Sequence, residues 1–307
     1  MSAVTLFRRL AVVTALFAYL QIALGGVVRV SGSGLGCPDW PLCHGRPYPP
    51  ADIHAIIEYS HRAVGSVTGV LIIATVIMAW AVFRTRRPRV AWLAAASLIG
   101  VVGEGALGGV VVAHDLAPWL VVVHLGLAMT ILGFLVATAV LAMPPSDGKP
   151  SRNFRWLAAL SVVATFVMLL TGSTVVASQA DRLCRSWPLC GNGFQLDFGG
   201  VSAYTMLHRG AVLVIGLLLV YVLMTALRQW PSEGIGRWAG VTLAVLVVQI
   251  AVGAGAAVTD AAFFNGLHVA LATLVFAGVL ATAVSTLPRA DRSPEPARMA
   301  VVERSSA

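Results

Sequence analysis

The sequence predicts an all-α integral membrane protein whose eight transmembrane helices form two four-helix bundles related by a pseudo-twofold axis. The first observation is composition, because 58% of the 307 residues are hydrophobic and only 11% are charged. The second is a set of eight mostly apolar stretches of about 20 residues, the length that crosses a bilayer. The third is a repeat, since the segment CPDWPLC at residues 37–43 returns as CRSWPLC at residues 184–190.

Each span is predicted from a run of apolar residues. Glycines dilute the third and seventh runs, but glycine is common in membrane helices because it lets backbones approach closely. The first run follows two arginines and could be read as a signal peptide. We expect it to be retained, because LGGVV at residues 24–28 corresponds to TGSTV at residues 171–175 in the fifth run. In chain order, the spans are expected at Leu10–Val28, Ala63–Phe83, Val90–Ala113, Trp119–Met143, Phe154–Ala177, Leu207–Leu227, Trp238–Val258 and Gly266–Leu287.

The repeat divides the chain into an N-terminal four-helix half at residues 1–145, a C-terminal half at residues 146–290, and a tail at residues 291–307. The polar, proline-containing tail is expected to be disordered and cytoplasmic. Basic residues collect on the cytoplasmic side of a membrane, and with the N-terminus inside, the inner segments carry 15 of the 21 Lys and Arg residues. We therefore predict a multi-pass cell-membrane protein with both termini in the cytoplasm. Because these charges are scattered over short loops, nucleic acid is not an expected partner.

Both cysteine pairs are expected in loops outside the cytoplasm, where neighbouring thiols form disulfides. The spacing within each pair permits a small closed loop, so we predict the bridges Cys37–Cys43 and Cys184–Cys190. Metal binding by the four cysteines is the alternative, although metal sites favour a tighter Cys-x2-Cys spacing. Whether the first bridge is redox-active or structural is left open.

Four of the seven histidines are expected about one turn inside the outer ends of even-numbered spans: His61 and His124 in the first half, and His208 and His268 in the second. An ionisable residue inside a span is costly and usually functional. Even-numbered spans run in the same direction, so the two histidines of a half should lie at a similar depth. Two facing imidazoles suit bis-histidine ligation of haem. The alternative is four histidines that only hold helices together through hydrogen bonds.

Three charged residues accompany these histidines. Arg62 and Arg209 directly follow the first histidine of each half, and a guanidinium suits a carboxylate such as a haem propionate; the alternative is an arginine that reaches the lipid headgroups. Glu58 stands three residues before His61, whereas the equivalent position in the second half is Thr205. Since residues three apart share a helix face, Glu58 can approach a group bound at His61 and exchange a proton there. The alternative is an exposed interfacial carboxylate.

The segment GGVVRVSGSGLGCPDWPLCHG at residues 25–45, the motif Glu58-x-x-His61-Arg62 and the eight spans resemble haem A synthase, and the resemblance extends from Leu10 to Leu287. It implies an oxidoreductase that converts the C8 methyl group of haem O to a formyl group through a hydroxylated intermediate, for terminal oxidase biogenesis. It also implies that haem O is delivered by haem O synthase.

The resemblance further implies a role for each membrane histidine. His208 and His268 would ligate a resident haem b, whereas His61 and His124 would hold the substrate haem. Glu58 would be essential beside the substrate. One departure is Glu104, where glutamine is expected, as in the equivalent Gln249; its role is left open.

Two other classes are compatible with part of the pattern. A cytochrome b-like membrane electron carrier or quinone oxidoreductase would also use paired histidines, but it does not require Glu58 in only one half. A transporter built from two repeats would predict no bound chromophore. The residues do not identify the electron donor or oxidant, the way oxygen is activated, or whether the chain forms a homo-oligomer.

Overall fold

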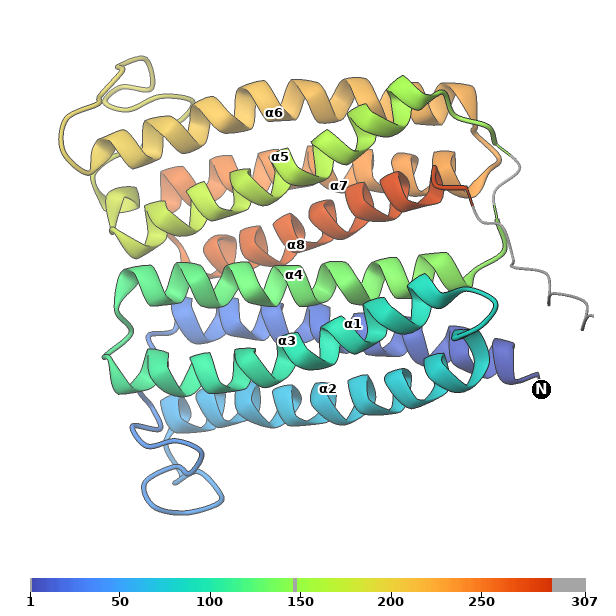
Figure 1. Cartoon of the computed structure of the whole chain (residues 1–307). Coiled ribbons are helices and arrows are strands. Elements are labelled where there is room, and N and C mark those ends of the chain that lie inside the picture. The colour runs from blue at the N-terminus through green and yellow to red at the C-terminus, as the bar shows by residue number, and fades with distance from the viewer. Residues whose placement is uncertain (1, 146–147, 289–307) are drawn as a thin grey trace, which may run out of the picture.

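The computed structural model describes residues 2–145 and 148–288 and consists of long helices (Figure 1). Eight of them are long and apolar enough to cross a membrane, and the described residues contain no β-strand. The predicted class, an all-α integral membrane protein with eight spans, is confirmed. The predicted tail at residues 291–307 lies outside the described residues. The helices are α1 (Ala3–Val30), α2 (Ile53–Phe83), α3 (Pro88–Ala113), α4 (Pro118–Ala142), α5 (Arg152–Ala177), the short 3-10 helix η1 (Ala180–Arg182), α6 (Ser202–Gln229), α7 (Gly234–Thr259) and α8 (Ala262–Ser285).

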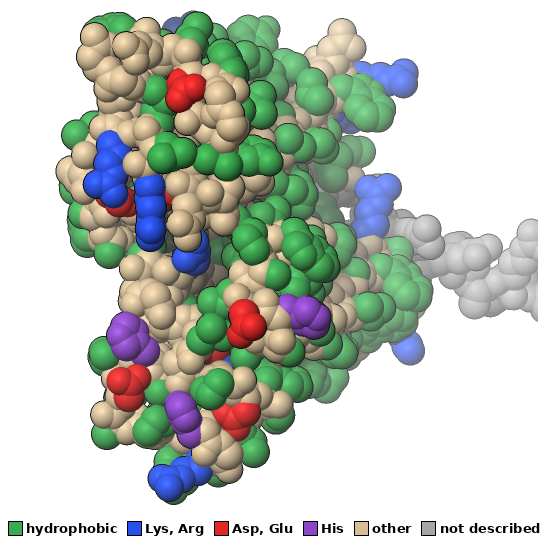
Figure 2. Space-filling model, turned by 90° about the vertical axis from the view of Figure 1, so that its left-hand side faces the viewer, with side chains coloured by type: hydrophobic (Ala, Val, Ile, Leu, Met, Phe, Trp, Pro, Cys, Tyr) green, Lys and Arg blue, Asp and Glu red, His purple; other side chains and the backbone are tan. Residues whose placement is uncertain are grey.

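The surface fits a membrane protein. Ile99 and Val214 are large apolar residues on helices, yet they are 76% and 68% exposed, which lipid favours and water does not. Figure 2 shows the end of the molecule that carries the α1–α2 and α5–α6 loops. Charged side chains and histidines lie on this end, and hydrophobic side chains cover most of the flank.

Helix α2 begins at Ile53, well before the predicted start at Ala63. Asp52 caps its first turn, because the carboxylate of Asp52 accepts a hydrogen bond from the Ala55 N–H at 2.9 Å. Hydropathy marks only the apolar part of a helix, so the polar first turns of α2 are missed by that criterion. This early start places the whole Glu58-to-Arg62 motif on the helix.

The four membrane histidines lie deeper in their helices than expected. His61 is the ninth residue of α2, and His124, His208 and His268 are each the seventh residue of α4, α6 and α8. Because an α-helix has 3.6 residues per turn, they stand about two turns from the helix start rather than one. His124, His208 and His268 thus occupy the same position relative to the starts of their helices.

The helices of each half contact one another in a ring. Helix α1 contacts α2 and α4, and α3 contacts the same two, so that α2 and α4 are opposite members. In the second half, α5 contacts α6 and α8, and α7 contacts the same two, so that α6 and α8 take the equivalent places. Figure 1 shows α1 to α4 below α5 to α8 in this view. The pseudo-twofold axis and the boundary at residue 145 stay predictions.

Contacts of α1 and α4 with α8, and of α4 with α5, join the two sets of helices. A side-chain carbon added at Gly26 of α1 would lie only 3.2 Å from Val269 Cγ1 of α8, so the absence of a side chain permits this close approach. Phe276 of α8 belongs to the same buried cluster as Met129 and Leu132 of α4. One histidine of each pair therefore stands on a central helix, α4 or α8, and the other on α2 or α6.

Both cysteine loops extend from the same end of the helices, and the N-terminus lies at the other end (Figure 1). From the basic-residue bias we expect the loop end to face away from the cytoplasm. Alkaline phosphatase, which is active only outside the cytoplasm, should be active when fused after Gly45 and inactive when fused after Lys149 or Ala307. The reverse pattern would overturn the predicted orientation.

Candidate functional site

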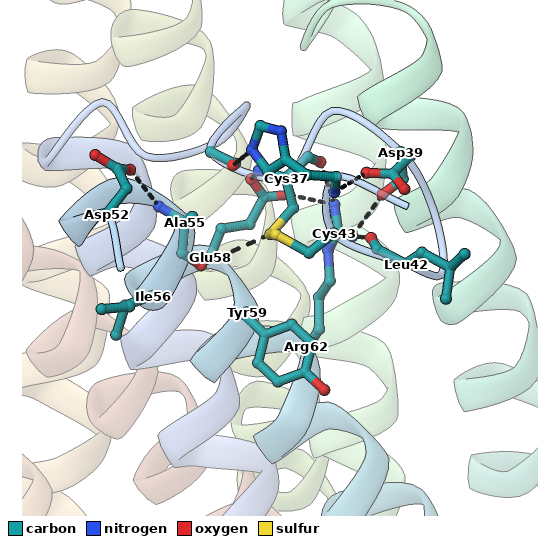
Figure 3. Close-up of a disulfide and its surroundings, with 12 residues drawn as sticks. Cys37, Asp39, Leu42, Cys43, Asp52, Ala55, Ile56, Glu58, Tyr59 and Arg62 are labelled. Atoms are coloured by element: carbon teal, nitrogen blue, oxygen red, sulfur yellow. Dashed lines mark hydrogen bonds and ion pairs between the residues drawn. A yellow bond between two sulfur atoms is a disulfide. The ribbon is translucent and has the colours of Figure 1, made fainter. Parts of the chain in front are cut away.

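The Cys37–Cys43 bridge closes a small loop between α1 and α2, and two side chains of α2 hold this loop (Figure 3). Glu58 Oε2 accepts a hydrogen bond from the Cys37 N–H at 2.8 Å. Glu58 Oε1 forms an ion pair with the guanidinium of Arg62. Glu58 is only 4% exposed, so its carboxylate has lost most of its water and depends on these partners.

Arg62 fastens the loop through main-chain carbonyl groups. Its guanidinium donates to the carbonyl oxygens of Cys37, Asp39 and Leu42, each at 2.7 Å. Together with Glu58, these acceptors use the four N–H groups of the two terminal nitrogens and leave only Nε–H. Sequence reasoning missed this role, and the predicted contact between Arg62 and a haem propionate stays a prediction.

The second loop has a weaker version of this arrangement. It is closed by the Cys184–Cys190 bridge, and Arg209 donates to the carbonyl oxygens of Cys184 at 3.2 Å and of Pro188 at 3.3 Å. Thr205 takes the place of Glu58, and its buried Oγ1 has no hydrogen-bond partner among the described residues. Only the first half therefore has a carboxylate between the helix and its loop.

Both predicted disulfides are present, and the structure contains no free cysteine in the part of the chain it describes. The alternative of a cysteine metal site is therefore wrong for this structure. Within the same part, no three His, Cys, Asp or Glu side chains are grouped so that they alone could hold a metal ion.

Asp39 braces the first loop, and sequence reasoning missed it. Its carboxylate accepts hydrogen bonds from the main-chain N–H groups of Gly45, at 2.7 Å, and His44. These bonds, that of Gly45 first, hold the pKa of Asp39 below its ordinary value. His44 itself contacts the carbonyl oxygen of Gly36 through Nε2 at 3.0 Å. The aspartate next to prolines in a short loop was the available signal, since aspartate stabilises turns through main-chain N–H groups.

Each of the four membrane histidines has one polar neighbour on the preceding helix. These neighbours compensate in part for the loss of water in the membrane. Gln21 was missed, although a glutamine inside an apolar span was a visible signal. The pairs are His61 Nε2 with Gln21 Nε2 at 3.3 Å, His124 Nδ1 with Glu104 Oε1 at 3.1 Å, His208 Nδ1 with Thr171 Oγ1 at 3.0 Å, and His268 Nε2 with Gln249 Nε2 at 3.4 Å.

Glu104 differs in chemistry from the other three neighbours. It is the carboxylic acid among them and stands where the second half has Gln249. Its Oε1 lies at ion-pair distance from His124 Nδ1, but the two groups are not aligned for a hydrogen bond. The His124 imidazole is therefore next to an oxygen without being fixed by it.

The arrangement of the histidines fits haem. His61 and His124 stand on α2 and α4, opposite members of the first ring of helices, and His208 and His268 stand on α6 and α8, which take the equivalent places in the second. In His61, His124 and His268, Nδ1 is buried without a hydrogen-bond partner among the described residues. A neutral imidazole is a common ligand for haem iron. The donor set suits one bis-histidine haem in each half, and the assignment of these ligands stays a prediction.

Removing either disulfide should destabilise the protein to a similar extent, because both bridges close loops of the same length. For such loops, chain entropy predicts a loss of about 2 kcal/mol in the free energy of unfolding. Replacing Cys37 and Cys43 by serine should also speed hydrogen exchange at the main-chain N–H groups of residues 36–45, where Glu58 and Arg62 bind. The matched control replaces Cys184 and Cys190, and equal exchange of residues 36–45 in the two variants would contradict this expectation.

Comparison with known proteins covers nearly the whole chain. A family described as cytochrome oxidase assembly protein matches residues 8–56 and 51–284. The haem A synthase of Alkalihalophilus pseudofirmus is 30% identical over 281 residues, which cover 87% of this chain and 93% of that protein. The haem A synthase of Shouchella clausii is 27% identical, over 88% of this chain and 93% of that protein. The haem A synthase of Halalkalibacterium halodurans is 29% identical, over 82% of this chain and 87% of that protein. The chain belongs to the haem A synthase family of cytochrome oxidase assembly proteins.

Proposed function

We propose that the protein converts haem O to haem A by oxidising the C8 methyl group to a formyl group through a hydroxylated intermediate. Similar proteins named haem A synthase support this proposal. The observation that carries it is a pair of membrane histidines in each half, with a buried carboxylate, Glu58, beside only one pair. Haem O synthase is the expected source of the substrate, and the product serves terminal oxidase assembly.

The two halves are proposed to hold different haems. His208 and His268 would hold a resident haem b, which supplies one-electron transfer when bound. His61 and His124 would hold haem O in the half that contains Glu58. The buried carboxylate of Glu58 in the first half, where the second half has Thr205, supports this division of roles.

Glu58 is proposed to exchange protons beside the substrate. Oxidation of a methyl group to a formyl group removes one electron pair on forming the alcohol and another on forming a geminal diol, which then loses water. Written with water as the source of oxygen, each oxidation releases two electrons, which must pass to an electron acceptor outside the protein, and two protons, which a positioned acid–base group can accept. Glu58 shares a helix face with His61, and Arg62 with the Cys37 N–H holds its carboxylate in one place.

The function is tested by a visible spectrum of the purified protein with chromatography of the extracted pigments. We expect haem B together with haem O or haem A in the wild-type protein. His208→Ala and His268→Ala should each lose the low-spin haem b signal and the activity, because each removes one of two axial bonds to iron. If both variants kept a full complement of haem B with an unchanged spectrum, the assignment of the C-terminal ligands would be wrong.

The same measurement separates the alternatives. Haem B alone, without haem O or haem A after growth with haem O synthase, would favour a cytochrome b-like electron carrier or quinone oxidoreductase. A protein without a Soret band would instead indicate a transporter. Either result would overturn the proposed function.

Glu58→Gln tests the proposed proton exchange, since it retains the size of the side chain and removes the ionisable group. Haem A formation should fall by about 10²–10⁴-fold, the usual effect of losing a general acid or base. Haem O or the hydroxylated intermediate should accumulate, and haem b should stay bound. Pigment chromatography measures all three.

Thr205→Ala is the matched control in the other half and should change haem A formation little. A near-normal yield of haem A in Glu58→Gln would reduce Glu58 to a residue that holds the cysteine loop. If Thr205→Ala were the more damaging variant, the roles of the two halves would be reversed.

A further inference from the structure

A glycine of the preceding helix lies against each of the four membrane histidines. If a Cβ atom were added to each of these glycines, the nearest atom outside the glycine's own helix would be Cε1 of the histidine imidazole. The glycines of the two halves are equivalent in the repeat, with offsets of 172 − 25 = 147 and 253 − 108 = 145. The pairs, with the distance from the added carbon to Cε1, are Gly25 with His61 at 3.2 Å, Gly108 with His124 at 3.5 Å, Gly172 with His208 at 2.9 Å, and Gly253 with His268 at 2.7 Å.

The fit is closer in the second half than in the first. At Gly172 and Gly253 the added carbon would lie within 3.0 Å of the imidazole, which is far inside the contact distance of about 3.5–4.0 Å between carbon atoms. In the first half the distance is 3.2 Å at Gly25, which is still a tight contact, and 3.5 Å at Gly108, which is an ordinary contact. The backbones of α5 and α7 therefore support their imidazoles directly, whereas the α3 backbone leaves space beside His124.

The polar neighbours do not divide by half. His208 is held by a 3.0 Å hydrogen bond with Thr171 on the helix that also contributes Gly172, whereas His124 has Glu104 nearby without hydrogen-bond alignment. The amide contacts of His61 with Gln21, at 3.3 Å, and of His268 with Gln249, at 3.4 Å, are nearly equal. The halves therefore differ in backbone contact, and polar contact adds to the difference only at His208.

We infer that Gly25, Gly108, Gly172 and Gly253 are positioning residues for the four histidines, and that the two halves use them differently. Close support in the second half fixes His208 and His268 in advance, which lowers the ordering cost of binding and suits a haem that stays bound. Looser support at His124 in the first half lets that imidazole turn aside, which suits a haem that enters as substrate and leaves as product. This inference rests on the proposed function.

General helix packing is the competing explanation, because small residues allow any two membrane helices to approach. The chain offers glycines that separate the two explanations. A carbon added at Gly105 of α3, or at Gly216 of α6, would meet no atom within 4 Å. Alanine at these positions tests the cost of losing a glycine in a membrane helix without touching an imidazole.

The experiment compares Gly253→Ala and Gly172→Ala with Gly108→Ala, Gly105→Ala and Gly216→Ala in full-length protein in detergent. The readouts are haem B per polypeptide and the low-spin electron paramagnetic resonance signal of the bis-histidine iron. Gly253→Ala and Gly172→Ala should weaken haem b retention by about 10- to 100-fold, as overpacking a close contact does, and should shift the low-spin signal. Gly108→Ala and both controls should keep haem b and its signal.

A wild-type measurement makes the inference independent of how the variants fold. Excess apomyoglobin should remove haem from the protein in two phases, and His61→Ala should abolish the fast phase only. Haem loss that is faster from His208 and His268 than from His61 and His124 would overturn the inference, as would an unchanged haem b signal in folded Gly253→Ala and Gly172→Ala. Either result leaves the proposed function standing if haem O and haem B are extracted, whereas a wild-type protein without haem B contradicts the proposed function itself.

Discussion

A polar side chain inside a bilayer has no water to bind, and this constraint governs how the helices are paired. Each membrane imidazole has a polar neighbour on the preceding helix, so consecutive helices are linked two by two along the chain. These neighbours satisfy only part of the ring in His61, His124 and His268, whose Nδ1 atoms are buried without a hydrogen-bond partner among the described residues. The helices alone therefore do not complete the polar contacts of these three imidazoles.

The same constraint acts at the outer end of α2. A buried carboxylate is stable only with compensating charge and hydrogen bonds, and Glu58 obtains both from Arg62 and from the Cys37 N–H. The cysteine loop is therefore part of the environment of Glu58. In the second half, where Thr205 replaces the carboxylate, Arg209 still binds loop carbonyls, but at 3.2–3.3 Å instead of 2.7 Å.

Much of this organisation could be predicted because the chain is duplicated. A motif that returns 147 residues later identified both disulfides, which the structure confirms, and the same repeat, with an offset of 147 or 144 residues, singled out the four membrane histidines. The contacts of Arg62 were not predictable, because the path of an irregular loop is absent from the pattern of residue types. Gly25 and Gly172 were visible at matching places of the repeat, and Gly108 and Gly253 only as a dilution of the third and seventh apolar runs. Which of them faces an imidazole depends on how each helix is rotated, and the packing of all its neighbours determines that rotation.

Two adjacent glycines of α1 touch different halves of the protein. Gly25 faces His61, and Gly26 faces Val269, the residue that follows His268. One dipeptide thus contacts a membrane histidine of the first half and the neighbour in sequence of a membrane histidine of the second. Because close-packed interiors do not deform freely, a small slide of α1 along its axis would change both contacts together. The hydrogen bond from Arg29 of α1 to the carbonyl oxygen of Val176 of α5 would change with them, so that α1 couples the two halves through its backbone and through one side chain.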